Sequence, residues 1–376
     1  MNLIKGIGII GCGQRMIDNL TQLFKINPCI NIIGVYDPNP GSISRLKEFL
    51  KKDVIVYDDY QSLIKNPDIE WILIGSINKA HKEQLIAALD NNKNIFSEKP
   101  LVITIDECME VKKHLKPNLN CLISYPLRHS PHYKKIKELI DRGEIGDIIS
   151  MEFNETIPFN HGSFMKTDWR RFKENSGGFI VEKCCHDMDL ANWIIKSLPK
   201  KVASFGGANF YIEKNSNIYE DYTKQKELKF IGNKIPNPFI IEKDVIDNQV
   251  VIIEYYNGVR AVFHTNSNSS FPERRMYICG SKGTIRADLI KGKIELQDIF
   301  SENEKQVIDT KTFDSHGNGD EFLMKNLNKV ILNEKHINDF DDALKSALTV
   351  IMIEQARTKN EIVDLTQVWK ELGFLK

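Results

Sequence analysis

The sequence predicts an α/β protein with a doubly wound parallel sheet in its first third and an α/β domain with a large, mostly antiparallel open sheet after it. Two observations predict the parallel sheet: short apolar runs alternate with helical patterns, and a glycine-rich turn follows the first run. Longer stretches of alternating residues later in the chain predict the antiparallel sheet. We therefore expect one domain at residues 1–125 and a second at residues 126–376.

The first parallel strand is expected where residues 5–15 read KGIGIIGCGQR. The apolar residues of this strand are Ile4, Ile7, Ile9 and Ile10. Gly11 and Gly13 suit a tight turn into a helix at Met16–Ile26, where a pyrophosphate can approach the backbone and the positive end of the helix. Met16 stands where the dinucleotide fingerprint usually has its third glycine, so we expect looser packing between helix and strand.

The next apolar run, Ile30–Tyr36, ends at an acidic residue, Asp37. A carboxylate at the tip of the second strand accepts hydrogen bonds from a ribose diol and repels a 2′-phosphate. The motif therefore favours NAD, although Arg45 leaves NADP open. Asp37 also begins a run of turn-forming residues, so a plain turn is the alternative interpretation.

The remaining elements follow from the same patterns. In the first domain we expect strands at Val54–Tyr57, Trp71–Ile74, Asn94–Ser97 and Cys121–Ser124, and a helix at Lys82–Leu89. In the second we expect helices at His132–Arg142 and Asp341–Thr358, and strands at Val250–Tyr256 and Val259–Thr265. Asn257-Gly258 between these strands is a hairpin signal, whereas the polar, lysine-rich residues 211–248 look like an insertion.

The composition is that of an ordinary enzyme-sized chain, with 376 residues, 41% of them hydrophobic, and 51 basic and 51 acidic side chains. This balance gives no reason to expect a nucleic acid or a membrane surface as a partner. Seven cysteines without a C-x-x-C pair indicate reduced thiols and a cytoplasmic location. The short apolar start lacks a cleavage site and no run reaches membrane-spanning length, so we expect neither a signal peptide nor a membrane span.

Lys99 is the first candidate for chemistry, because the tripeptide Glu98-Lys99-Pro100 directly follows the apolar stub Ile95-Phe96. Ligands of open α/β sheets bind at the carboxyl ends of the strands, and proline fixes the turn there. A lysine at this place can polarise a hydroxyl or carbonyl oxygen. A solvated loop lysine is the alternative, and spacing alone does not decide between them.

A second candidate is the ionisable cluster that follows Gly177-Gly178. If a helix begins near Val181, Glu182 and His186 are four residues apart on one face, with Asp189 nearby, and Lys183 and Asp187 form another such pair. A histidine supported by carboxylates is the commonest proton carrier near neutral pH. A charge ladder on a helix surface is the alternative, which the flanking apolar residues disfavour.

Cys184, Cys185, His186 and Asp187 are consecutive, so a metal site has to be weighed. Adjacent residues rarely point at one ion, and structural zinc draws its ligands from spaced pairs that this chain lacks. We therefore expect no metal. A thiol nucleophile beside His186 is a remote alternative, because neighbours in a helix point in different directions.

Taken together, these segments resemble the glucose-fructose oxidoreductase, inositol dehydrogenase and rhizopine-catabolism (Gfo/Idh/MocA) family over nearly the whole chain. The motifs that carry the resemblance are Gly11-x-Gly13, Glu98-Lys99-Pro100, Tyr125–Pro131, Gly143-Glu144-Ile145-Gly146, Asp168-Trp169-Arg170 and the run from Gly177-Gly178 to His186-Asp187-x-Asp189. The resemblance implies a Rossmann domain, an α/β domain whose open sheet mediates oligomerisation, Lys99 as the oxygen-polarising group and His186 as the acid/base. Glu182 stands where the family commonly has aspartate, which keeps a carboxylate with a longer reach.

The resemblance also implies site residues. Cofactor contacts are expected from Gly11, Gly13, Gln14, Arg15, Asp37, Ser76, Asn78, His81, Glu98 and Lys99. Substrate contacts are expected from Arg128, His161, Trp169, Arg170, Lys183, Asp189 and His316, with Glu182 joining Lys99 and His186 as catalytic residues. Without the resemblance, His161 and His316 would be interpreted as loop histidines, and Asp320 is equally open.

The sequence thus predicts an NAD(P)-dependent dehydrogenase that acts on a secondary hydroxyl of a sugar, sugar derivative or cyclitol, as a homodimer or homotetramer. One alternative is a glycosidase or lyase in which bound NAD transiently oxidises the sugar. Another is a dinucleotide-binding sensor without turnover, which the intact Lys99 and His186 disfavour. The choice of sugar depends on pocket shape, which residue spacing does not reveal.

Overall fold

The computed structural model describes residues 6–226, 236–301, 304–312 and 314–376, and the chain divides into two compact units. The first unit comprises Met1–His129 and Asn318–Ala347, and the second comprises Ser130–Gly317 and Leu348–Lys376. The expected division into 1–125 and 126–376 differs from this arrangement at residues 126–129 and at Asn318–Ala347, which both belong to the first unit.

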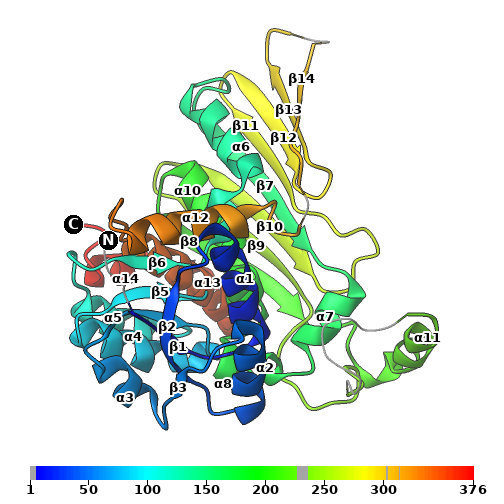
Figure 1. The fold of residues 1–376 in the computed structure, drawn as a ribbon. Helices are drawn as coiled ribbons and strands as arrows, with labels where there is room; N and C mark the ends of the chain where they lie inside the picture. The colour runs from blue at the N-terminus through cyan, green and yellow to red at the C-terminus, as the bar shows by residue number, and fades with distance from the viewer. Residues whose placement is uncertain (1–5, 227–235, 302–303, 313) are drawn as a thin grey trace. The chain divides into compact units, whose positions relative to one another are not determined.

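The return of this segment has a physical cause in helix α12 (Gly319–Ile331). Its buried apolar residues belong to the same hydrophobic core as the first strands and helix α1 (Gln14–Ile26), against which it lies in Figure 1. These residues are Leu323, Met324, Leu327, Val330 and Ile331. The segment is therefore a structural part of the first unit.

A six-stranded parallel sheet forms the centre of the first unit, in the order β3-β2-β1-β4-β5-β6. The strands are β1 (Gly6–Ile10), β2 (Asn31–Tyr36), β3 (Ile55–Val56), β4 (Ile69–Ile74), β5 (Asn94–Ser97) and β6 (Cys121–Ile123). The predicted doubly wound sheet is confirmed, while Ile4 and Lys5 lie outside the described residues. The strand order reverses between β1 and β4, which is where such sheets bind ligands.

Helices connect these strands in sequence order. They are α1, α2 (Pro40–Leu50), α3 (Tyr60–Lys65), α4 (His81–Asp90) and α5 (Ile105–His114), with short 3₁₀ turns at Asn78–Ala80 and Pro126–His129. Their beginnings follow local sequence signals, as in α5, where Thr104 and Glu107 form a reciprocal capping box.

The looser packing predicted from Met16 is wrong. Met16 is fully buried, and a Cβ added to Gly75, at the end of β4, would come within 2.8 Å of Met16 Cε. The glycine that permits close approach therefore lies on the strand side of the contact instead of on the helix. Helix α1 keeps its close packing without the third glycine of the fingerprint.

The second unit contains a nine-stranded sheet in the order β14-β13-β12-β11-β7-β10-β9-β8-β15. The strands are β7 (Ile148–Thr156), β8 (Pro199–Gly207), β9 (Asn248–Tyr255), β10 (Arg260–Asn266), β11 (Arg275–Gly280), β12 (Gly283–Asp288), β13 (Lys293–Asp298), β14 (Gln306–Asp309) and β15 (Val363–Asp364). Among the pairings described, only β7 with β10 is parallel, which confirms the mostly antiparallel sheet. The predicted hairpin joins β9 to β10, and Gly258 supplies the positive φ of 86° that its turn requires.

The helices of the second unit are α6 (Pro131–Asp141), α7 (Phe159–Met165), α8 (Lys173–Ser176), α9 (Phe179–Lys183), α10 (Cys185–Ile195), α11 (Asn217–Gln225) and α14 (Thr366–Glu371), with 3₁₀ turns at Trp169–Arg171 and Glu213–Asn215. Helix α13 (Phe340–Lys359) runs from one unit into the other.

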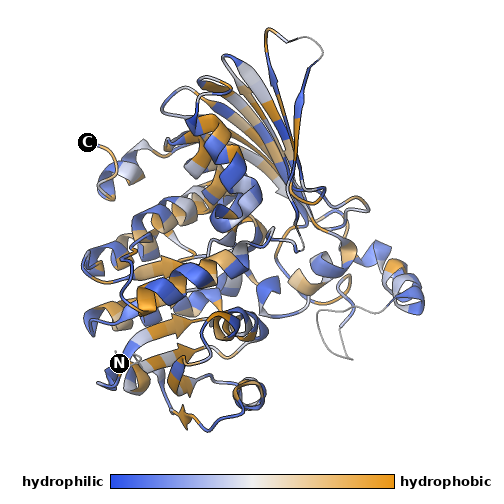
Figure 2. Ribbon diagram, turned by 45° about the horizontal axis from the view of Figure 1, so that its top comes forward, coloured by the Kyte–Doolittle hydropathy of each residue, from blue (hydrophilic) through white to orange (hydrophobic). Residues whose placement is uncertain are grey.

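Figure 2 shows the alternation of apolar and polar residues along the strands of the large sheet. One face of this sheet is therefore buried and the other is open.

The expected insertion at residues 211–248 is anchored at both ends where the structure describes it. The Asp247 carboxylate accepts hydrogen bonds from the backbone N–H groups of Asn209, Phe210 and Tyr211, at 2.8–3.1 Å. The ring of Phe159 packs on the rings of Phe210, Tyr211, Tyr222 and Phe239.

None of the helices in the described ranges is long and apolar enough to cross a membrane.

Candidate functional site

The glycine-rich turn after β1 has the geometry that a dinucleotide needs. Gly11 has a φ of +87°, and a Cβ there would come within 2.3 Å of the Ser76 backbone nitrogen. Gly13 is the N-cap of α1, and a Cβ there would meet nothing within 4 Å. The open space at this helix N-terminus fits a pyrophosphate, while the Gln14 amide turns to Asp18 at 2.9 Å.

Asp37 is fixed at the tip of β2 by two backbone hydrogen bonds. Its Oδ2 accepts from Cys12 N at 2.7 Å and its Oδ1 from Asn39 N at 2.8 Å. Each carboxylate oxygen keeps a further lone pair that a ribose hydroxyl can use. Arg45 donates to Ser42 Oγ at 3.1 Å, within α2. The carboxylate is thus held in place by the same turn that fits the pyrophosphate.

Arg15 and Glu98, both predicted to contact the cofactor, contact each other. Arg15 Nε lies 3.1 Å from Glu98 Oε1, and Arg15 Nη2 lies 2.6 Å from Asp320 Oδ1. Asn19 Nδ2 also donates to Glu98 Oε1, at 2.6 Å. These bonds tie the end of β5 to helix α1. Asp320 is thereby placed beside the dinucleotide turn, on α12.

His81 connects the turn after β4 to the turn that carries Lys99. His81 Nδ1 lies 2.8 Å from Pro100 O and Nε2 lies 3.3 Å from Ser76 O. Lys99 is half-buried and is joined to Pro100 by a cis peptide bond. Asn78 is buried in the 3₁₀ turn before α4, and Ser76 Oγ donates to Gln84 at 2.6 Å. The predicted cofactor residues of the first unit therefore cluster at the carboxyl ends of β1, β2, β4 and β5.

In the second unit the predicted single helix from Val181 is interrupted. Helix α9 ends at Lys183, Cys184 has a non-helical ψ of 5°, and α10 starts at Cys185. The expected pair between Lys183 and Asp187 does not form, because each side chain reaches a partner from another element. The prediction of a continuous helix that carries a pair between Lys183 and Asp187 is wrong for this reason.

Glu182, on α9, is paired with Arg170. Arg170 Nε lies 2.7 Å from Glu182 Oε1, and Arg170 Nη1 lies 2.5 Å from Asp168 Oδ2. The guanidinium stacks on the rings of Trp169 and Phe164, at 4.2 and 4.7 Å from their centroids. Arg170 is therefore held on its edges by carboxylates and on its faces by aromatic rings.

Four buried charged side chains, Glu155, Lys183, Asp187 and Arg274, form what we call the ionic cluster. Glu155 Oε1 lies 2.9 Å from Lys183 Nζ and 2.8 Å from Arg274 Nη2. Arg274 also binds Asp187 through two parallel hydrogen bonds of 2.9 and 3.0 Å. The two positive and two negative charges thus neutralise one another next to the turn between α9 and α10.

The ionic cluster shifts the acidity of its carboxyl groups in opposite directions. Burial raises the pKa of Asp187 to about 7, although Arg274 acts against this shift. Burial also acts on Glu155, but Arg274 and Lys183 outweigh it and hold the pKa of Glu155 below its usual value. The opposite directions follow from Lys183, which adds a second positive charge beside Glu155.

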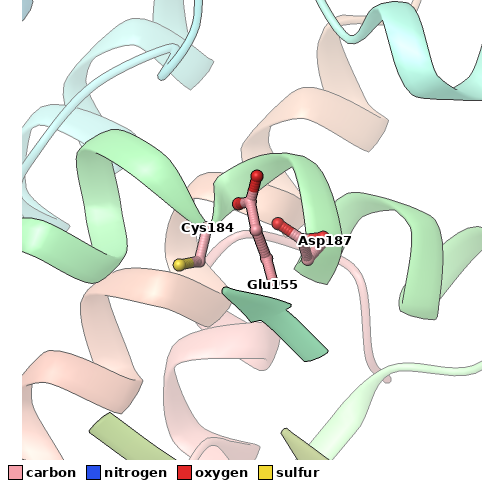
Figure 3. A group of neighbouring side chains, drawn as sticks. All are labelled: Glu155, Cys184 and Asp187. Atoms are coloured by element: carbon pink, nitrogen blue, oxygen red, sulfur yellow. The ribbon is translucent and has the colours of Figure 1, made fainter. Parts of the chain in front are cut away.

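Glu155, Asp187 and Cys184 also have the residue types of a metal site, and one potential ligand atom of each lies within 4.8 Å of the others (Figure 3). The donor set does not fit a cation, because Lys183 and Arg274 already neutralise the carboxylates. The Cys184 thiol points to Thr265 Oγ1 at 3.6 Å, and burial raises its pKa well above the usual value. The chemistry of this group is that of an internal salt-bridge network.

His186 lies at the start of α10, directly before Asp187, and its side chain is only 3% exposed. Its ring centroid is 5.2 Å from that of His316, so the structure brings these two predicted residues together. Asp189 is buried on the same helix, and His161 lies on α7, 6.4 Å from the Phe164 ring. Arg128, in the first unit, pairs with Asp342 at 2.9 Å.

Sequence reasoning missed Glu155 and Arg274. Both stand in phase with buried apolar residues of their strands, Glu155 with Met151 and Phe153, and Arg274 with Met276 and Ile278. A charged residue at a position that the strand period assigns to the core needs an opposite charge nearby. This break in the alternation was the signal that could have identified them.

Comparison with known proteins identifies the family of the chain. Residues 5–125 match the family model described as the oxidoreductase family with an NAD-binding Rossmann fold, and residues 133–286 match the GFO/IDH/MocA C-terminal domain. A relative from Bacillus subtilis strain 168, the uncharacterized oxidoreductase YrbE, is 28% identical over 290 residues, covering 75% of this chain and 73% of that protein.

A second relative has a described activity. The inositol 2-dehydrogenase/D-chiro-inositol 3-dehydrogenase of Lactiplantibacillus plantarum is 26% identical over 259 residues, covering 65% of this chain and 70% of that protein. Among solved structures, levoglucosan dehydrogenase in complex with NADH and levoglucosan has a TM-score of 0.79 at 18% identity, covering 96% of this chain and 99% of that one. This structural likeness covers both units and concerns the fold.

Proposed function

Because the chain belongs to the Gfo/Idh/MocA family of oxidoreductases with an NAD-binding Rossmann domain, we propose that it transfers a hydride between NAD and a secondary hydroxyl of a sugar, sugar derivative or cyclitol. The observation that carries the proposal is His186, a buried histidine that directly precedes Asp187 of the ionic cluster in the second unit. The dinucleotide turn with Gly13 and Asp37 supports the cofactor. The inositol and levoglucosan dehydrogenases named above support the substrate class.

Bound NAD would supply the hydride acceptor, and the side chains of this chain would handle the proton and the oxygen. We propose that Lys99 polarises the oxygen that is oxidised and that His186 accepts its proton. Glu182 is bound to Arg170, so its role is to hold this part of the site in place, together with Asp168. Lys183, which donates to Glu155, has the same supporting role.

The charges around His186 support an uncharged substrate. Arg170 and Lys183 were expected to bind substrate, but their charges are matched by Glu182, Asp168 and Glu155. No cation among these pairs is left for a carboxylate or phosphate of the substrate. A neutral polyol that binds through hydroxyl groups, with His161, Trp169, Asp189 and Arg128 as further contacts, is the class that we propose.

We also propose that the chain forms a homodimer or homotetramer through the open face of the large sheet. Phe205 and Val250 are cross-strand neighbours on this face, and so are Ile252 and Val262. Their side chains are 67%, 44%, 54% and 42% exposed, whereas the residues between them along the strands are buried. A contiguous apolar patch of this kind is typical of protein–protein contacts.

We propose a cytoplasmic location for the chain. All seven cysteines are free thiols, which supports this proposal.

The test is a panel of neutral sugars, cyclitols, sugar acids and sugar phosphates, assayed with NAD and NADP at the absorbance band of the reduced nicotinamide. We expect reduction of NAD by a neutral polyol. Lys99→Ala and His186→Ala should each lower kcat by about 10²-fold to 10⁴-fold, as is typical when a general acid or base is lost. Lys79→Ala, which changes another lysine of the first unit, is the matched control.

Each other outcome points to a defined alternative. Normal activity of both site variants would overturn the assignment of Lys99 and His186. Tightly bound NAD, with product formed but no net NADH, would instead show redox cycling by a glycosidase or lyase. Binding of NADH without any turnover across the panel would indicate a sensor.

A further inference from the structure

The rings of His186 and His316 form a pair in which one ring is buried and the other reaches the surface. His186 is 3% exposed, whereas His316 is half-buried. Their ring centroids are 5.2 Å apart and their planes are inclined by 55°. A proton accepted by the buried ring therefore has a second titratable ring beside it on the solvent side.

The loop that carries His316 is held in place by bonds of its backbone. His316 N donates to Asp314 Oδ1 at 2.8 Å, and Gly317 O accepts from Ser130 Oγ at 2.8 Å. Gly317 has a φ of +58°, and a Cβ there would come within 2.5 Å of Ser130 Oγ and of Leu289 Cδ1. The position of the ring is therefore determined by the fold of the loop.

Arg274 joins this loop to the helix of His186. Its Nη1 donates to Ser315 O, directly before His316, at 3.2 Å. Its Nε and Nη2 bind the carboxylate of Asp187, directly after His186. One buried guanidinium thus binds the backbone of the residue before His316 and the side chain of the residue after His186, so it links the two segments that carry the rings.

Resting on the proposed oxidation of a hydroxyl, we infer that His316 relays the substrate proton from His186 to solvent. His186 accepts the hydroxyl proton on one ring nitrogen while the hydride leaves the same carbon for the nicotinamide. The opposite ring nitrogen of His186 then gives its proton to His316, directly or through one water molecule. His316 releases that proton to the solvent, so that one substrate yields one ketone, one NADH and one proton.

Other charged groups lie around this pair in the second unit. Asp187 and Asp189 lie on the helix of His186, Glu155 on β7, Lys183 on α9 and Arg274 before β11. Four of these five are paired within the ionic cluster, and burial raises the pKa of Asp187 to about 7, so Asp187 is a further titratable group next to His186 in sequence. His316 is the titratable ring that lies beside the His186 ring.

The first test needs no substrate. Histidine ring nitrogens are followed by NMR during a pH titration of the NAD-bound protein, in the wild type and in the variant His316→Gln. We expect the titration midpoint of His186 to move by at least about half a pH unit, because coupled groups share their titration. His264→Gln, which changes an exposed histidine on β10, should leave it unchanged. An unchanged midpoint in His316→Gln would overturn the relay.

The second test is kinetic. His316→Gln should lower kcat about 10-fold, less than the loss of the primary base, and leave KM for the polyol and binding of NADH within about 2-fold. Added imidazole or a higher buffer concentration should restore kcat, because a small base replaces the missing ring. A raised KM without rescue would instead make His316 a substrate contact and overturn the relay.

The two tests separate the relay from the proposed function. If no polyol is oxidised by the wild type, the proposed function fails, while the titration still decides whether the two rings exchange a proton.

A third variant, Ser130→Ala, removes the donor to Gly317 O and keeps both histidines. We expect this variant to lower kcat with partial rescue by imidazole, and a wild-type kcat would show that the loop does not need this bond.

Discussion

At the scale of single residues, Asp37 is the side chain on which cofactor choice depends. Its two backbone hydrogen bonds, from Cys12 and Asn39, fix the carboxylate at the tip of β2. The sequence located this residue because a strand, a turn and an acidic tip follow one another in a short segment. The backbone bonds were not predictable, since they depend on the exact path of two turns.

We expect Asp37→Ser to raise KM for NAD by about 10-fold to 100-fold, because hydrogen bonds to a charged group contribute roughly 1.5–3 kcal/mol. KM for NADP should fall in the same variant, because the repulsion of the 2′-phosphate is removed. Initial rates with both cofactors measure this, and Asp53→Ser, another acidic residue of the first unit, is the control. An unchanged ratio of the two KM values would contradict the role of Asp37.

Lys166 is a second residue with a measurable consequence. Its side chain is fully buried, its Nζ donates to Ile246 O at 2.8 Å, and the Phe179 ring lies 4.6 Å away. Burial lowers the pKa of Lys166 from 10.5 to about 7. The unfolded chain therefore binds more protons between these two pH values, so this residue makes the folded state more stable as pH rises from 7 to 10.

Lys166→Met removes this dependence. The Tm of the wild type minus that of Lys166→Met should become more positive between pH 7 and pH 9, with on the order of 1–2 kcal/mol involved. Thermal unfolding of both proteins in matched buffers measures it. Lys214→Met is the control, because it changes an exposed lysine of the same unit. A constant difference in Tm would contradict a neutral Lys166.

At the scale of elements, the contact between α1 and β4 shows how a motif can depart from its pattern without losing its geometry. With the usual fingerprint glycine at position 16, the helix backbone itself would face Gly75. In this chain the Met16 side chain fills that space. The sequence showed the missing glycine, but the compensating one lies 59 positions later, since Gly75 follows a different strand. Pairings between distant segments of this kind do not follow from local patterns.

Met16→Gly completes the fingerprint in sequence and should nevertheless destabilise the protein. Loss of a buried methionine side chain typically costs about 2–5 kcal/mol, and glycine inside a helix adds about 1 kcal/mol. Urea unfolding measures the change, with Met16→Leu as the volume-conserving control that should cost less than about 1.5 kcal/mol. Equal stability of Met16→Gly and the wild type would contradict the packing described here.

The break between α9 and α10 explains why the second site was only partly predicted. The run from Glu182 to Asp189 was identified as functional from its residue types, and its helical character was predicted from the period of its apolar residues. Cys184 interrupts the helix, and the partners of Lys183 and Asp187 come from β7 and from the residue before β11. Which distant charges would meet there depended on the tertiary structure.

At the scale of the whole molecule, the two units use their sheets differently. The parallel sheet has helices in all its connections, as its continuous apolar runs predicted, whereas the large sheet keeps one open face with alternating residues. Sequence patterns predicted both sheets but not the strand order of the larger one. The one parallel pairing among its described strands, β7 with β10, joins strands more than 100 residues apart.

The open face provides a prediction about assembly. Ile252→Asp with Val262→Lys should shift the mass in solution toward that of a monomer, because charges replace two neighbouring apolar side chains of the patch. Size-exclusion chromatography with light scattering measures this mass. Ile55→Asp, which changes an exposed isoleucine on β3 of the first unit, is the control. A wild-type mass in the double variant would remove the open face as the interface.

The return of α12 to the first unit also bears on the order in which the protein can form during synthesis. Met16 and Leu20 share a hydrophobic core with Leu323 and Leu327, which the ribosome adds about 300 residues later. The first unit therefore exposes part of its core until most of the second has been made, and contacts so distant in sequence slow folding. A nascent chain that stops before Gly319 should need chaperones to stay in solution, although its parallel sheet is already complete.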